Sequence, residues 1–148
     1  MRDIDLAKQL LLEEGLTLVL VRDGEVLFKG KGKGLKELSG IHRENIDLLL
    51  NSAAADTVIG KAAAMFYSAG QIAEVDGALM SEAATEHLTS QNIPYHYTVS
   101  TPHILNQTES DLCPMEKIAL ASQTVEELQA GMQKFFMALN AKQSKGAN

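Results

Sequence analysis

The sequence predicts an α/β fold in which helices cover both faces of a sheet, a three-layer α-β-α sandwich. Segments with strand character alternate with helical segments along the chain, which is typical of a sheet whose later strands are parallel. The first strand-like segment, residues 16–21, is apolar at nearly every position, as expected for a strand that is covered on both sides. The length of 148 residues suits one domain, which we place at residues 1–140.

The N-terminal part is expected to form a helix and then a hairpin. Residues 4–14 place apolar side chains on one helical face, and Gly15 is a natural C-terminal stop. The first strand and a second strand at 25–28 flank Asp23-Gly24, a pair that suits a tight turn with positive φ.

The segment after the hairpin predicts less regular structure. Residues 29–34 alternate lysine and glycine and match neither a helix nor a strand, so they form either a loop over a ligand pocket or a solvated connection. A short helix is expected at 45–50. Asp56 has the chemistry of an N-cap, and we expect it to begin an alanine-rich helix at 57–68.

Two further strands and a helix are expected in the second half of the chain. Residues 71–79 and 93–99 have strand character. Between them, Ser81 is expected to cap a helix that runs to Gln91 and ends with Asn92 in a left-handed conformation.

The C-terminal part is expected to hold two helices. One begins at Cys113, followed by proline at the first helical position, and runs to about Ala121. The other begins at Thr124, which forms a capping box with Glu127. The polar segment 141–148 is expected to be a disordered tail.

Composition and charge exclude several classes of function. The net charge of −6 argues against nucleic-acid binding, which depends on lysine and arginine that neutralise phosphates. The apolar runs are too short to span a membrane, and the acidic N-terminus does not resemble a secretory signal. A single cysteine, Cys113, cannot form an internal disulfide. We therefore expect a soluble cytoplasmic protein.

Two local patterns point to a site. Gly60 would lie one turn inside the predicted helix, where glycine costs about 1 kcal/mol relative to alanine. A nearby ligand or backbone would explain it, and Lys61 would then hold an anionic group near the positive helix end. The alternative is close helix–sheet packing beside an exposed lysine.

The second pattern is Cys113-Pro114-Met115-Glu116. A thiol at a helix N-terminus is a candidate nucleophile because the helix dipole stabilises its thiolate. Glu116 is expected to reach back to the backbone N–H of Cys113 as in a capping box. The alternative is that Cys113 is a small buried apolar residue.

These segments resemble a known family. The stretch 55–65, Ser81-Glu82-Ala83, Asn106-Gln107-Thr108 and the stretch 112–116 are similar to the bacterial "domain of unknown function 1893" family. The resemblance covers about residues 15–121 and implies a cytidine-deaminase-like fold with a five-stranded mixed sheet.

The resemblance does not extend to the zinc motifs of true deaminases. Those enzymes hold zinc with residues at the starts of two helices, and here these places read 56–61 and 80–84, which lack the ligands. Water activation by zinc needs three protein donors, so we expect no zinc-dependent deamination and no metal or other cofactor.

The implied fold would gather helix starts at one edge of the sheet, where ligands bind in such folds. We expect the helix starts at Asp56, Ser81 and Cys113 to meet there. Our candidate ligand-binding residues are Asp56, Gly60, Lys61, Ser81, Glu82 and Asn106, and our candidate catalytic residues are Cys113 and Glu116.

Three functions fit these residues. The first is a metal-free binding or regulatory module for a nucleotide-like or anionic small molecule. The second is a metal-independent enzyme with Cys113 as nucleophile and Glu116 or a histidine moving protons. The third is an assembly protein, and a homodimer is one form that it could take.

Overall fold

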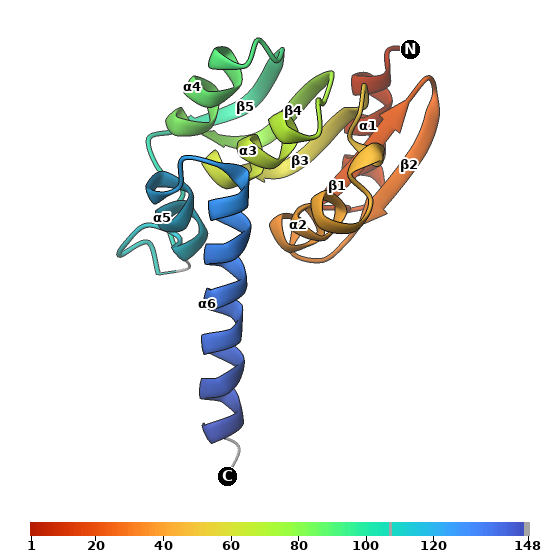
Figure 1. Ribbon diagram of the computed structural model, residues 1–148. Coiled ribbons are helices and arrows are strands. Elements are labelled where there is room, and N and C mark those ends of the chain that lie inside the picture. Colours follow the sequence, from red (N-terminus) through yellow and green to blue (C-terminus); the bar gives the residue numbers. More distant parts are fainter. Residues whose placement is uncertain (107, 147–148) are drawn as a thin grey trace.

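A computed structural model describes residues 1–106 and 108–146, in which five strands form one mixed sheet between helices (Figure 1). The strands are β1 (Leu18–Arg22), β2 (Glu25–Gly30), β3 (Ala53–Ile59), β4 (Glu74–Ser81) and β5 (Tyr95–Thr101). The helices are α1 (Asp3–Glu13), α2 (Gly34–Glu44), η1 (Ile46–Leu48, a 3₁₀ turn), α3 (Lys61–Ala69), α4 (Glu82–Ser90), α5 (Pro114–Ala121) and α6 (Val125–Gly146).

The strands lie in the order β2-β1-β3-β4-β5. β1 is antiparallel to both of its neighbours, whereas β3, β4 and β5 are parallel to one another. The predicted α/β class and the parallel arrangement of the later strands are therefore confirmed.

The first strand separates two apolar cores, as its composition predicts. Leu18 and Leu20 pack in the larger core with residues of α2 and α3, while Val19 and Val21 pack on the other face with Ala7 of α1. Figure 1 shows α1 and α3 on opposite sides of the sheet. The turn after β1 also has the predicted conformation, with φ of 52° at Asp23 and 78° at Gly24.

The segment around Asp56 differs from the prediction. Residues 53–59 form the strand β3 instead of a helix start, and α3 begins only at Lys61. Alanine favours helices in isolation, but here its small side chain fits a strand buried between β1 and β4. Asp56 is therefore a strand residue, and Gly60 is the N-cap of α3.

Other boundaries also move. The sequence reading assigned no helix to residues 34–44, which form α2, and the helix expected at 45–50 is reduced to the turn η1. The two later strands begin two or three residues further along the chain than predicted, and each ends two residues further along.

Several helix ends form as predicted. Ser81 caps α4 by accepting a hydrogen bond from the Ala84 N–H at 3.1 Å, and Asn92 has a φ of 58°. Thr124 accepts a bond from the Glu127 N–H, also at 3.1 Å.

Helix α6 extends away from the rest of the molecule in Figure 1. Its first half packs on the larger core through Leu128 and Met132. The helix continues to Gly146 and so includes much of the segment expected to be a disordered tail, while 147–148 lie outside the described residues. No helix among the described residues is long and apolar enough to cross a membrane.

Candidate functional site

A cleft of about 290 Å³ lies where the N-termini of α2, α3 and α5 meet the end of β3. Its wall includes Gly34 and Leu35 from α2, Asp56 from β3, and Ile104 from the segment before α5. Three helix N-termini do meet here, but they belong to α2, α3 and α5, whereas we expected α3, α4 and α5.

The three helix starts leave backbone donors unpaired. None of the N-caps of α2, α3 and α5 forms a side-chain capping bond. Six residues that line the cleft have a backbone N–H with no hydrogen-bond acceptor among residues 1–106 and 108–146. They are Gly34, Leu35, Ala62, Ala63, Met115 and Glu116. Unpaired N–H groups at helix starts attract anions and other acceptors.

Asp56 lines this cleft and is 2% exposed. Its Oδ2 accepts a hydrogen bond of 2.6 Å from the hydroxyl of Tyr67, and its Oδ1 accepts one of 3.3 Å from the Val58 N–H. Burial raises the pKa of Asp56 to about 7, although these hydrogen bonds oppose the rise. Near neutral pH this carboxyl therefore exists in both its charged and its neutral form.

Tyr67 comes from the middle of α3 and is fully buried. Burial raises the pKa of its hydroxyl, and the neighbouring Asp56 carboxyl raises it further. The phenol therefore stays protonated and acts as a donor to Asp56.

Glu116 is the second buried carboxyl of the cleft, with 3% of its surface exposed. The predicted capping box is wrong. Glu116 accepts a hydrogen bond of 3.2 Å from the Lys61 N–H, whereas the Cys113 N–H donates to the Ile104 carbonyl. Glu116 therefore connects the starts of α5 and α3. Its burial raises its pKa, against the effect of the Lys61 N–H.

This contact explains the glycine at position 60. A Cβ there would lie 2.4 Å from Oε2 of Glu116 and 3.1 Å from Ile104. The groups close to Gly60 are therefore side chains of the same chain, and not the ligand or backbone that we expected.

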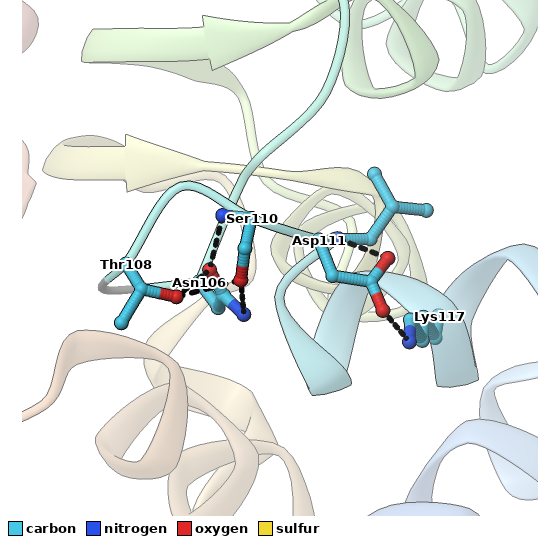
Figure 2. Close-up of polar contacts among 6 residues, drawn as sticks. Asn106, Thr108, Ser110, Asp111 and Lys117 are labelled. Carbon is cyan, nitrogen blue, oxygen red and sulfur yellow. Dashed lines mark hydrogen bonds and ion pairs between the residues drawn. The ribbon is translucent and has the colours of Figure 1, made fainter.

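Cys113 lines the cleft as the N-cap of α5 and is partly buried. The loop before it is held by its own polar groups, as Figure 2 shows. Oδ1 of Asn106 accepts hydrogen bonds of 3.1 Å from the Ser110 N–H and the Thr108 hydroxyl. Asn106 thus shapes this loop and does not line the cleft, and Gln107 lies outside the described residues.

The remaining candidates lie apart from the cleft wall. Ser81 is fully buried as the cap of α4, and Glu82 is exposed on that helix. Lys61 contributes its backbone N–H to the bond with Glu116, but the residue is not in the lining. The structure thus brings Asp56, Gly60, Cys113 and Glu116 together, four of the eight candidates.

The Lys-Gly segment contributes to the cleft wall, which is one of the two alternatives that its sequence left open, whereas sequence reasoning missed α2. Gly32 and Lys33 line the cleft beside Gly34, so this segment is part of its wall. Glu37 fixes the segment by accepting a hydrogen bond of 3.0 Å from the Gly32 N–H. The helical spacing of Leu35, Leu38 and Ile41 was the available signal for α2.

The described residues contain no group of three or more His, Cys, Asp or Glu side chains arranged to hold a metal ion.

Comparison with known proteins places the chain in a family. A family model described as "Domain of unknown function (DUF1893)" matches residues 6–136. The crystal structure of a DUF1893 family protein from Thermotoga maritima is similar to this chain with a TM-score of 0.80 and 23% identity, over 89% of this chain and 88% of that one. This likeness shows a shared fold. No curated protein matches. The chain belongs to the DUF1893 family, a family of domains of unknown function.

Proposed function

We propose that this protein is a binding module for a small anionic, nucleotide-like molecule, which it holds in the cleft between α2, α3 and α5. The observation that carries the proposal is the set of unpaired amides that belong to three helix starts lining the same cleft. A phosphate or carboxylate would accept hydrogen bonds from such amides, and the positive ends of the helices would favour its charge.

The other wall residues suit the rest of such a ligand. Val58, Ile104 and Met115 give the cleft apolar surface on which a base or other flat group can pack. The volume of about 290 Å³ is close to the lower end of the range for small-molecule sites, which favours a compact ligand.

The carboxyl of Asp56 makes the proposed binding depend on pH. Below its pKa of about 7 the group is neutral and can donate a hydrogen bond to the ligand. Above that pKa it is charged and repels an anion. Affinity for an anionic ligand should therefore fall as the pH rises through 7.

A thermal-shift experiment with matched proline variants tests the proposal. The probes are inorganic phosphate, nucleosides and nucleoside monophosphates. Gly34→Pro removes one unpaired amide at the first position of α2, and Lys33 before it is already extended, as a following proline requires. Glu82→Pro makes the same change at α4, outside the cleft.

We expect a monophosphate to stabilise the wild-type protein and Glu82→Pro alike. Gly34→Pro should weaken binding by about tenfold or more, because a hydrogen bond to a charged group contributes about 1.5–3 kcal/mol. If no probe shifts the melting temperature, or if both proline variants behave alike, the proposed binding site is wrong.

A second function is favoured by the position of Cys113. Its thiol lines the cleft at the start of α5, where a thiolate would be stabilised and could act as the nucleophile of a metal-independent enzyme. Rapid alkylation of the folded protein by iodoacetamide, slowed by a bound nucleotide, would support this enzyme. Sluggish labelling would rule it out. For either function we propose a cytoplasmic location, in keeping with the single cysteine.

A further inference from the structure

The two edges of the sheet are built differently. The edge strand β2 carries the charged residues Glu25 and Lys29, and its pairing with β1 shifts register between Leu20 and Val21. Charged side chains and irregular pairing are devices that keep an edge strand from pairing with another chain. The β2 edge is therefore protected.

The opposite edge strand, β5, lacks these devices. Its sequence, Tyr-His-Tyr-Thr-Val-Ser-Thr, contains no lysine, arginine, aspartate, glutamate or proline and consists largely of good strand formers. Residues 96–100 are all exposed, and β5 pairs with β4 alone in the part of the chain that the structure describes. Its outer edge is thus a regular strand that is free to pair.

Apolar surface continues from this edge across the sheet. Tyr97 is 47% exposed and Val99 53%. Val99 lies beside Leu79 of β4, and Leu79 lies beside Val58 of β3, which is 43% exposed. Leu79, between the two exposed valines, is partly buried. An apolar row that reaches an open strand edge is typical of an interaction surface.

We propose that β5 pairs antiparallel with β5 of a second copy of this chain, about a two-fold axis at Thr98, so that the two sheets become continuous. This register overlaps the whole of β5. It sets Tyr97 opposite Val99 and Tyr95 opposite Thr101, which are favourable pairs of an aromatic with a β-branched residue.

The sequence of β5 favours a second copy as the partner. At the axis Thr98 lies opposite Thr98 of the second copy, a pair that can share a hydrogen bond. His96 lies opposite Ser100, so pairing brings no two like charges together even though the whole chain carries a net charge of −6. A symmetric interface of this kind is the commonest way in which a soluble protein forms a dimer.

Charge substitutions at the axis test this interface by light scattering. Thr98→Lys and Thr98→Glu each place like charges opposite each other, so each variant should be monomeric. Mixed together, they should form a heterodimer with the mass of the wild-type dimer. Thr98→Ser keeps the hydroxyl and should remain dimeric. Because Thr98 is exposed, all three variants should keep the circular dichroism spectrum of the wild type.

Cross-linking gives a second readout that does not require a charged variant to fold. In a Cys113→Ser background, Thr98→Cys should form an intermolecular disulfide on oxidation, because its two copies face each other across the axis. Ser100→Cys, which faces His96, should cross-link much less.

A wild-type protein that is monomeric at every concentration would overturn the proposal. A dimer that survives both charge variants would also overturn it, since association would then use another surface. Failure of the Lys–Glu mixture to associate, or equal cross-linking of the two cysteine variants, would rule out the register centred on Thr98.

Discussion

Replacing Asp56 by asparagine should remove a pH dependence of stability that this buried carboxyl produces. Burial raises its pKa from 3.8 to about 7. The folded state therefore holds the proton more tightly than the unfolded state does. The resulting stabilisation is fully present below about pH 3.8 and is lost as the pH rises through about 7.

The size of the effect follows from the difference between the two pKa values. A difference of about three pKa units, at about 1.36 kcal/mol for each, corresponds to about 4 kcal/mol of unfolding free energy. Asparagine stays neutral and keeps one oxygen to accept the bond from Tyr67. The unfolding free energy of Asp56→Asn minus that of the wild type should therefore rise by about 4 kcal/mol from pH 4 to pH 8.

Urea denaturation followed by circular dichroism at pH 4 to 8 measures this difference. Asp111→Asn serves as the control. A hydrogen bond from Lys117 lowers the pKa of Asp111, so any stability due to that carboxylate is lost only below about pH 3.8. The control curve should parallel that of the wild type over this range. If the difference in unfolding free energy between the wild type and Asp56→Asn stays constant from pH 4 to pH 8, the reasoning is refuted.

Three further substitutions test contacts in and next to the cleft, each by urea denaturation at pH 7. Tyr67→Phe removes the donor to Asp56 and should cost about 1–3 kcal/mol, and an unchanged stability would mean that the bond is not formed. Gly60→Ala should cost about 1–3 kcal/mol, because its methyl group would lie 2.4 Å from the Glu116 carboxylate, which is buried and bonded to the Lys61 N–H and so cannot move aside freely. Gly34→Ala should change stability by less than about 0.5 kcal/mol, because its nearest neighbour would be 3.4 Å away. Equal losses for the two glycine variants would contradict these distances.

Features that depend on local chemistry could be predicted from the sequence. The turn at Asp23-Gly24 needs positive φ at two successive residues, and few pairs of residue types supply it. The cap of α4 needs a hydroxyl next to the first helical residue, and Ser81 supplies one. These signals lie within a few residues of the structure they specify.

Features that depend on tertiary contacts could not be predicted in this way. The alanines of β3 favour a helix locally, and only their burial in the centre of the sheet makes them a strand. The spacing of Cys113 and Glu116 predicts a local capping bond, yet Glu116 bonds to Lys61, 55 residues away in sequence. The cleft also depends on α2, because Gly34 and Leu35 of this helix line it and add two of its unpaired amides.

The most direct test of the ligand proposal is an amide NMR titration with a nucleoside monophosphate. The account predicts that the amide resonances of Leu35, Ala62 and Met115 shift together with one affinity, because one bound anion approaches all three helix starts. The amide of Ala84 in α4, which is already bonded to Ser81, should not move. Shifts confined to other regions of the chain, or no shifts at millimolar ligand, would contradict the proposal.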